Sequence, residues 1–329
     1  MNVLITGGTG FIGSRLALAC LGKRNSLTAL GREKNVAEAE NRKIVEAEVA
    51  EVILASVTHR EKMFELLQGV DLVYHLAAAQ HEANVPDQQF WEVNVTGTRN
   101  LLDASVNTSV KRFVHGSTIG VYGPSRNGSI HEQSPTIPDN IYGITKLEAE
   151  KLVLSFKEKI PVVITRISET YGPGDRRLLK LFKAIKKNVF FMIGEGTNLH
   201  HLIYIDDLIE GLFLAATVEK AAGNIFILAG KEPLTTNHMV SVIAKQLDTK
   251  MPKLRIPLSL LLTLATIFET VLRPMRIQPP LHRRRLDFFK KSFVFSRDHS
   301  QNVLGFLPKF TFQQGVTETA RWYKDLGYI

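Results

Sequence analysis

Within its first 13 residues the chain places a glycine-rich turn directly after an apolar strand. Val3-Leu4-Ile5 runs into Thr6-Gly-Gly-Thr-Gly-Phe-Ile-Gly13, and a helical pattern follows over residues 11–23. Glycines at these spacings let the backbone turn tightly and approach a pyrophosphate, which then lies at the unpaired N–H groups and positive end of the helix. Because the motif follows a strand and opens a helix, it predicts a dinucleotide site rather than an ordinary turn.

Short apolar runs alternate with helical patterns through the first two-thirds of the 329-residue chain. Strands are expected at residues 2–6, 26–30, 52–55, 71–77, 111–116 and 161–167, and helices at 11–23, 87–107 and 142–157. Parallel strands need a crossover to return, so this order predicts an α/β fold with a doubly wound parallel sheet, the Rossmann arrangement. We expect a dinucleotide-binding domain over residues 1–170. Residues 171–329 should form a smaller, mainly substrate-binding lobe, from which some strands and helices can return to the first domain.

The net charge of +9 is confined to the last quarter of the chain. Residues 1–249 carry 27 basic and 27 acidic side chains, whereas residues 250–329 carry 14 and 5. A basic segment attracts phosphates, anionic lipid or nucleic acid, or simply keeps a protein in solution. Aromatic residues are not interleaved with the basic ones, so nucleic-acid binding is not expected. The single Cys20 and the lack of a signal-peptide pattern predict a reducing, cytoplasmic location.

One apolar run, residues 256–272, is broken by Glu269 and falls short of the ~20 apolar residues that a membrane span requires. Basic residues flank it: Lys253, Arg255, Arg273 and Arg276. Such flanks suit a helix that lies in a membrane surface, so a peripheral membrane contact through residues 253–291 stays open. We favour a helix of the smaller lobe packed over the substrate pocket, because runs of this length are more often buried.

A tyrosine and a lysine are spaced to share one helix face. Tyr142 and Lys146 stand four positions apart, and Ser117-Thr118 ends the strand upstream. The ammonium of Lys146 would lower the pKa of the phenol from ~10 toward neutrality, so that Tyr142 could take a proton from an alcohol or return it to a ketone. Thr118 would hold the reacting oxygen. The alternative is that Tyr142 and Lys146 are an ordinary surface pair without a catalytic role. The glycine turn upstream argues against this alternative.

The tip of the second strand should read the ribose of the dinucleotide. The chain has Gly31-Arg32-Glu33 there. An acidic residue at the tip would accept from both ribose hydroxyls, whereas Arg32 could pair with a 2′-phosphate, so NADP is favoured over NAD. The alternative is that Arg32 is solvated and Glu33 takes the ribose.

Seven segments stand in a familiar order along the chain: Thr6 to Gly13, His75-Leu-Ala-Ala78, Asn94-Val-Thr-Gly-Thr98, Phe113 to Gly123, Tyr142 to Lys146, Tyr171-Gly-Pro-Gly-Asp175 and Tyr204-Ile-Asp-Asp207. Together they resemble the extended short-chain dehydrogenases/reductases, also called the NAD-dependent epimerase/dehydratase family. The resemblance implies that Thr118, Tyr142 and Lys146 form a catalytic triad. It also implies cofactor contacts from Gly7, Gly10, Phe11, Ile12, Arg32, Ser56, Leu76, Ala77, Ala78 and Ile167, with Asn94 supporting the site and with Tyr142 and Lys146 contacting the cofactor as well.

Departures from the family pattern narrow the range of reactions that the chain is expected to catalyse. Ala55-Ser56 stands where Gly-Asp is common, so Ser56 must replace the adenine contact or the contact is lost. Ile119-Gly120 follows Thr118, where the nucleotide-sugar dehydratases have Asp-Glu, so dehydration is not expected. The arginines at 283–285 resemble the diphosphate clamp of the epimerases poorly. Residues 281–322 look more like the 3β-hydroxysteroid dehydrogenase and flavonol reductase branch.

The sequence therefore predicts an NAD(P)-dependent oxidoreductase that moves hydride at a secondary alcohol or ketone carbon of an apolar substrate. A UDP-sugar 4-epimerase and a non-catalytic NAD(P)-sensing protein are the alternatives. Substrate contacts are expected from residues 80–85, residues 166–171 and the C-terminal lobe. No metal site is expected, because His75, His200 and His201 lack partners at metal-ligand spacing and are read as structural or pocket-lining. A homodimer through helices 87–107 and 142–157 is expected from the family.

Overall fold

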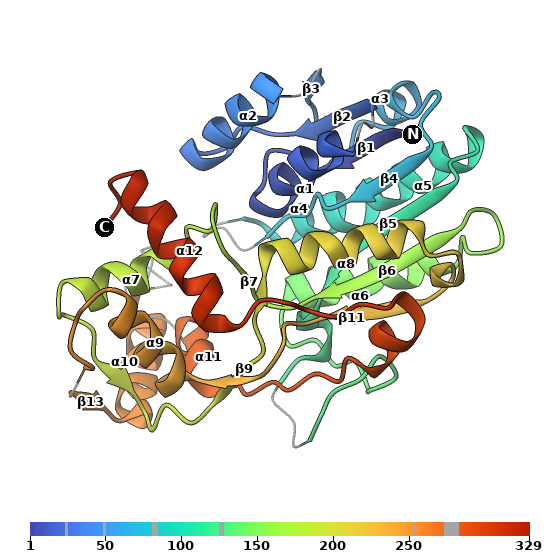
Figure 1. Ribbon diagram of the computed structural model, residues 1–329. Helices are drawn as coiled ribbons and strands as arrows, with labels where there is room; N and C mark the ends of the chain where they lie inside the picture. The colour runs from blue at the N-terminus through green and yellow to red at the C-terminus, as the bar shows by residue number, and fades with distance from the viewer. Residues whose placement is uncertain (24–25, 49–50, 81–84, 125–127, 253, 273–282) are drawn as a thin grey trace.

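The computed structural model describes the chain apart from residues 24–25, 49–50, 81–84, 125–127, 253 and 273–282. Its centre is a parallel sheet of seven strands in the order β11-β6-β5-β4-β1-β2-β3 (Figure 1). The strands are β1 (Asn2–Thr6), β2 (Ser26–Gly31), β3 (Glu51–Leu54), β4 (Leu72–His75), β5 (Arg112–Thr118), β6 (Val162–Ile167) and β11 (Ile225–Leu228). The strand order runs outward in both directions from β1 and β4, which confirms the predicted doubly wound sheet. Ligands bind such sheets at this switch point, beyond the carboxyl ends of the strands.

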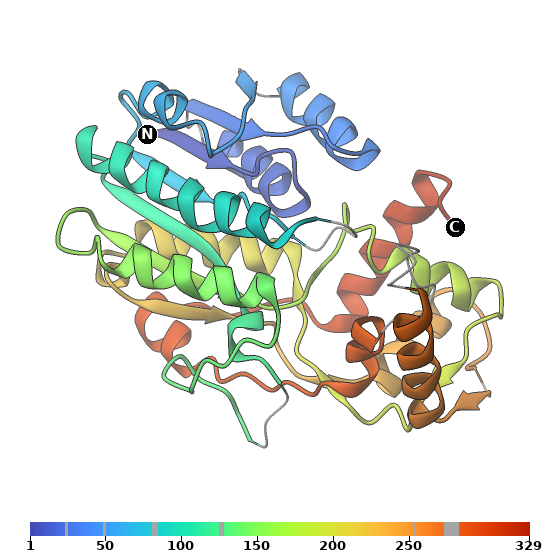
Figure 2. The same cartoon turned by 180° about the vertical axis from the view of Figure 1, so that it is seen from behind.

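Helices cover both faces of the sheet, as parallel sheets require. One face packs against α1 (Phe11–Gly22), α2 (Val36–Glu48) and α8 (Ile205–Thr217) (Figure 1). The opposite face packs against α3 (Arg60–Leu66), α5 (Gly97–Asn107) and α6 (Ile141–Leu154), as the reverse view shows (Figure 2). All four residues of β4 are buried, which explains why the strands are nearly continuous apolar runs in the sequence.

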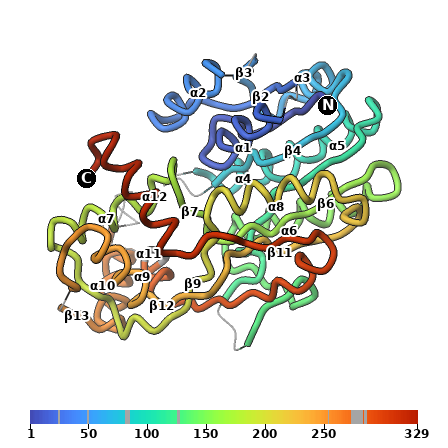
Figure 3. Tube along the Cα trace, viewed as in Figure 1, coloured from blue at the N-terminus to red at the C-terminus, as the bar shows by residue number. Residues whose placement is uncertain are grey.

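A smaller C-terminal lobe lies beside the carboxyl ends of the strands (Figures 1 and 2). Its helices are α7 (Leu179–Lys186), α9 (Thr236–Gln246), α10 (Leu258–Leu272), α11 (Arg283–Lys290) and α12 (Phe312–Asp325). Short strand pairs accompany them: β7 (Thr170–Tyr171) with β10 (Ile203–Tyr204), β9 (Leu199–His200) with β12 (Leu234–Thr235), and β8 (Met192–Ile193) with β13 (Arg255–Ile256). The last helix, α12, lies beside α7 (Figure 3), where the rings of Phe182 and Tyr323 meet edge to face at 5.0 Å.

The chain returns to the sheet between α8 and α9. Strand β11 pairs with β6 and becomes the edge of the sheet, so the C-terminal lobe is built from segments on both sides of this strand. Apolar side chains of α8, α9 and α12 belong to the same core as those of α1, as Leu16, Leu212, Met239 and Val316 illustrate. The lobe is therefore joined to the sheet by a shared core.

The apolar run of residues 256–272 forms a helix, but the expectation that it packs over the pocket is wrong. Within α10 only Ala265 and Glu269 are buried. Among the described elements the helix packs mainly against α11, and much of the rest of its surface is exposed. Among the described residues, no helix is both long and apolar enough to cross a membrane.

Candidate active site

The turn between β1 and α1 requires glycines, because other atoms already occupy the space that a Cβ atom would take. Gly7 has φ +76°, and a Cβ there would lie 2.9 Å from the amide nitrogen of Ala77 at the end of β4. A Cβ on Gly13 would lie 2.1 Å from the carbonyl oxygen of Gly7. The glycines thus let α1, the turn and β4 approach closely. Because Gly10, at the N-cap, has no side chain to bond them, the first N–H groups of α1 are open to an anion.

A cavity of about 650 Å³ extends from this turn along the carboxyl ends of the strands. Most of the residues predicted to form the site lie on its wall: Gly7, Gly10, Phe11, Ile12, Arg32, Leu76, Ala77, Ala78, Thr118, Tyr142 and Ile167. Three others lie outside the wall. Ser56 bonds to Thr58 at 2.8 Å between their hydroxyls, next to the wall residue Ala55, and Asn94 and Lys146 are buried behind the cavity.

Tyr142 is placed by the close approach of α6 to the end of β5. The side chain of Asn140 caps α6 by accepting from the amide of Gly143 at 3.0 Å. A Cβ on Gly143 would lie 2.8 Å from the carbonyl oxygen of Gly120, so glycine allows the helix to begin against the turn that follows β5. As a result, the side chain of Thr118 hydrogen-bonds with that of Tyr142.

Burial raises the pKa of Tyr142 to about 12, while the hydrogen bond with Thr118 and the positive charge of Arg177 act to lower it. The ammonium of Lys146 is directed elsewhere in this arrangement. It donates to the carbonyl oxygen of Gly116 at 2.7 Å. Burial lowers the pKa of Lys146 to about 8. At neutral pH, Tyr142 therefore carries its proton.

Asn94 lies on a π-helical turn, Glu92–Thr96, that interrupts the predicted helix of residues 87–107 between α4 (Asp87–Trp91) and α5. Its side-chain oxygen accepts from the amide of Ala79 at 2.7 Å, and its side-chain nitrogen donates to the carbonyl of the same residue at 3.2 Å. The nitrogen also donates to the hydroxyl of Thr145 at 3.0 Å. Isolated π turns of this kind often occur at functional sites. Asn94 thus ties the loop after β4 to the helix that carries Tyr142.

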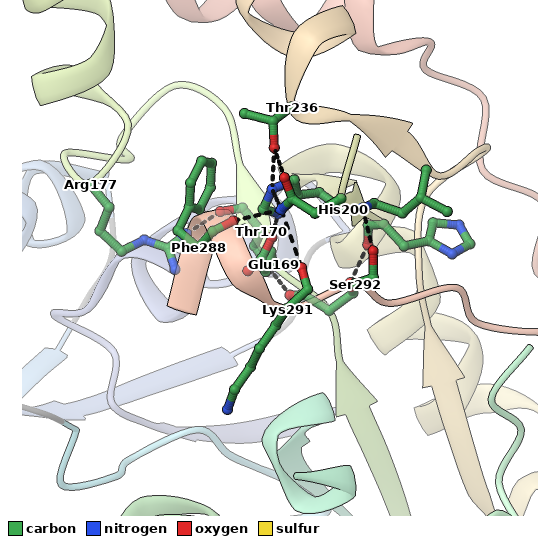
Figure 4. A network of polar contacts seen from close by, with 12 residues as sticks. Glu169, Thr170, Arg177, His200, Thr236, Phe288, Lys291 and Ser292 are labelled. Carbon is green, nitrogen blue, oxygen red and sulfur yellow. Dashed lines mark hydrogen bonds and ion pairs between the residues drawn. The ribbon is translucent and has the colours of Figure 1, made fainter. Parts of the chain in front are cut away.

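A polar network reaches the cavity from the C-terminal lobe (Figure 4). His200 lies between two partners, with Nδ1 3.1 Å from Oε2 of Glu169 and Nε2 3.1 Å from Oγ1 of Thr236. Its ring packs on that of Phe288 in α11, with centroids 4.2 Å apart. Burial would raise the pKa of Glu169, but the hydrogen bond with His200 and the charge of Arg177 bring it below its ordinary value. Glu169 is on the cavity wall as a carboxylate.

The segments predicted to contact substrate are placed unevenly. Residues 167–170 line the cavity, but Arg166 is turned away and forms a buried ion pair with Glu150 at 2.8 Å. Gln80 lines the cavity, Val85 does not, and residues 81–84 lie outside the described part of the chain. Arg177 was missed from the sequence. It lies on the cavity wall with a side chain 65% exposed and is bonded to Asp175 at 3.0 Å.

Charges of both signs line the cavity at the tip of β2. Arg32, Lys34 and Asn35 are on the wall next to Gly31, together with Glu38, whose carboxylate accepts from the amide of Lys34 at 2.7 Å. Glu33 is not on the wall and pairs with Arg42 at 3.0 Å. The sequence alternative in which Glu33 takes a ribose therefore finds no support in this geometry.

The sequence model of the NAD dependent epimerase/dehydratase family matches residues 3–229. The chain belongs to this family. Members of the family are NAD(P)-dependent enzymes, as the sequence predicts, and the glycine turn and the cavity beside it fit a dinucleotide.

The names of relatives within the family describe different activities. The N-acetyl-alpha-D-glucosaminyl-diphospho-ditrans,octacis-undecaprenol 4-epimerase of Escherichia coli O157:H7 is 26% identical, with 98% of this chain and 95% of the relative covered. The 4-hydroxy-2-methyl-3-oxo-4-farnesyl-3,4-dihydroquinoline-1-oxide ketoreductase of Stigmatella aurantiaca is 27% identical, with 96% and 95% covered. The 3beta-hydroxysteroid-dehydrogenase/decarboxylase isoform 2 of Arabidopsis thaliana is 27% identical, with 83% and 52% covered.

Solved structures show the same architecture over the whole chain. The crystal structure of UDP-glucuronic acid 4-epimerase from Bacillus cereus in complex with NAD superposes with a TM-score of 0.82 at 25% identity, covering 99% of both chains. The seven-stranded fold and its helices are thus those of the family.

Proposed function

We propose that this protein oxidises or reduces a secondary alcohol or ketone on an apolar substrate that carries an isoprenoid or steroid group, with NADP(H) favoured over NAD(H). The observation that carries the proposal is the hydrogen-bonded pair of Thr118 and Tyr142 on the wall of the cavity that the glycine turn opens. A bound nicotinamide would supply or accept the hydride. The residues of this chain handle the proton and the orientation of the reacting oxygen.

Tyr142 is the group that exchanges a proton with the substrate oxygen. Its pKa of about 12 keeps the phenol protonated at neutral pH, so the site as it stands can donate a proton to a ketone oxygen. Thr118 holds that oxygen through its hydroxyl. In the direction of alcohol oxidation the phenolate must form, and the charge of Arg177 favours it. The resting protonation state therefore supports reduction of a ketone.

The residues beside Thr118 disfavour an elimination. Ile119 is buried and apolar, and Gly120 follows it, so neither can act as an acid or base at a neighbouring carbon. The nearby carboxylate of Glu169 is held by His200. These features support plain hydride and proton transfer.

Two observations support an apolar substrate. The cavity wall includes the apolar side chain of Ile119, directly after Thr118. The names of three relatives that cover most of this chain contain undecaprenol, farnesyl and steroid, which all share a bulky hydrocarbon group.

Epimerisation of a sugar attached to a diphosphate is the second candidate. Arg177, which is exposed at the cavity wall, could contact a diphosphate, because a guanidinium matches phosphate geometry. A purely sensory protein is disfavoured by the intact trio of Thr118, Tyr142 and Lys146.

The test is turnover by the purified protein with NADPH or NADH and a panel of farnesyl, steroid and diphospho-sugar substrates. We expect consumption of NADPH with a ketone from the apolar set. Tyr142→Phe should lower kcat by about 10²-fold or more and leave cofactor affinity unchanged, because it removes only the proton donor. Conversion of a diphospho-sugar without net cofactor consumption would support the epimerase instead. Equal turnover by the wild type and Tyr142→Phe would contradict both candidates.

A further inference from the structure

Helix α10 presents an apolar stripe to the outside of the molecule. Leu260, Leu264, Ile267 and Val271 are 52, 37, 50 and 55% exposed. Their spacing of four, three and four residues places them on one helix face. We call these four residues the α10 stripe. A surface helix usually turns charged and polar side chains outward, so a contiguous apolar face indicates an interaction surface.

The polar groups next to the stripe need no contact with water. Thr263, Thr266 and Thr270 each donate their hydroxyl to the carbonyl oxygen four residues earlier, at 3.0, 2.9 and 2.9 Å. The one charged residue of α10, Glu269, is 6% exposed and pairs with Arg283 at 3.0 Å. Transfer of this helix face into an apolar phase would therefore bury no unpaired charge, and the hydroxyls of these three threonines would stay bonded.

Positive charge flanks α10 in the sequence. Residues 250–291 contain ten basic and two acidic side chains. Both acids are engaged, Glu269 with Arg283 and Asp287 with Lys291 at 3.4 Å. Lys250, Arg255 and Lys290 are exposed. Basic groups beside an apolar helix are the combination that binds anionic lipid headgroups.

The stripe is connected to the cavity through the lobe. Helix α10 packs on α11 through Glu269 and Arg283, and Phe288 of α11 packs on His200, which bonds to Glu169 on the cavity wall. The stripe and the cavity wall thus belong to connected elements, and Figure 2 shows the ribbons of α10 and α11 side by side in the lobe.

We propose that the α10 stripe seats the protein on a membrane surface that contains anionic lipids, with α10 lying in the plane of the interface. The alternative occupant is a second copy of this chain, packed stripe against stripe. That contact would bring two basic surfaces together, and like charges oppose such an association. An anionic bilayer satisfies the apolar face and the positive charge at the same time.

The test is co-sedimentation of the full chain with phosphatidylcholine vesicles, with and without about one third phosphatidylglycerol. We expect binding to the anionic vesicles, weakened by high salt. Leu264→Glu/Ile267→Glu should lower the partition coefficient by about tenfold or more, because each side chain contributes through burial in the interface. The matched control is Ile137→Glu/Leu307→Glu, which changes the charge equally at sites 59 and 57% exposed and should change binding less than about twofold.

Several results would overturn the proposal. The first is that the wild type fails to bind anionic vesicles. The second is that the two double variants lose binding equally, which would assign the effect to net charge. A wild-type dimer that dissociates in Leu264→Glu/Ile267→Glu and ignores vesicles would assign the stripe to a second copy. The assay needs neither substrate nor cofactor, so its outcome is separate from that of the proposed enzymatic activity.

Discussion

The ammonium of Lys146 lies 3.1 Å from the Nε2 atom of His115 in the middle of β5. Both side chains are buried. Burial lowers the pKa of His115 well below its ordinary value, and the charge of Lys146 acts in the same direction, so the imidazole is neutral and can accept from the ammonium. Lys146 is thus held by β5 as well as by its own helix.

The first prediction concerns the titration of Lys146. Its pKa is about 8 in the folded chain against an ordinary 10.5, so between these values the unfolded chain binds more protons at this residue. The free energy of unfolding of the wild type should therefore increase as pH rises across this window. This gain should disappear as pH falls back toward 8. Lys146→Met lacks this dependence. Between pH 7.5 and 9.5 we expect the wild type to gain about 1 kcal/mol or more over the variant in urea unfolding. Parallel pH curves would contradict this assignment.

The second prediction concerns cofactor choice. Arg32→Ala should raise KM for NADPH by about tenfold or more, because one charge-assisted contact to a phosphate is lost, and should leave KM for NADH within about twofold. Arg42→Ala is the control, since Arg42 pairs with Glu33 and Glu46 away from the cavity wall. Steady-state kinetics with both cofactors checks the prediction. Equal effects of Arg32→Ala on the two cofactors would show that Arg32 does not read the ribose phosphate.

The third prediction concerns the glycine turn. Gly13→Ala places a Cβ 2.1 Å from the carbonyl oxygen of Gly7, so α1 must move. We expect a loss of about 2 kcal/mol or more in the free energy of unfolding and a loss of cofactor binding. Gly22→Ala, in the last turn of the same helix, has no atom within 4 Å of the new Cβ and should be neutral or stabilising. Chemical unfolding and cofactor titration of both variants separate the two cases; wild-type behaviour of Gly13→Ala would refute the argument from close approach.

The fourth prediction compares two glutamates of α6. Glu150 is buried with Arg166 at 2.8 Å, whereas Glu148 pairs with Lys151 at the surface at 2.6 Å. Glu150→Gln leaves the guanidinium without its counter-charge and should cost about 3 kcal/mol in the free energy of unfolding. Glu148→Gln should change it by less than about 0.5 kcal/mol. If urea unfolding gave similar losses of the free energy of unfolding for the two variants, other groups would have to compensate the charge of Arg166 in Glu150→Gln.

The central sheet was largely predictable because most of its first six strands are buried and read as short apolar runs in the sequence, although the edge strand β3 has no buried residue. Strand β11 was not identified. It has four residues, and its partner β6 lies far away in the sequence, so its membership of the sheet depends on the path of the whole chain. The local sequence pattern also predicted a helix at residues 258–272, but it did not predict which elements pack against that helix. Exposure of α10 follows from the packing of α11, which periodicity does not encode.

The site divides in the same way. Gly7, Thr118 and Tyr142 were found because each stands in a short motif whose spacing carries its chemistry. Arg177 was not identified, and His200 was read only as structural or pocket-lining, since both approach the cavity through the folding of the loops after β6. Lys146 was found by its spacing from Tyr142, but its contact with His115 depends on the register between α6 and β5. Spacing along one helix places two side chains on a common face without fixing the direction of a long flexible one.

The contact of Gly143 with Gly120 has a consequence for redesign of this scaffold. The donor phenol and the hydroxyl beside it are positioned by backbone against backbone, within the sheet and the helix that covers it. Loops of the C-terminal lobe can therefore be exchanged or diversified to accept new molecules while the proton-transfer geometry stays as it is. A library built on residues 168–170 and 198–200 would vary selectivity and leave the acid–base chemistry as a constant.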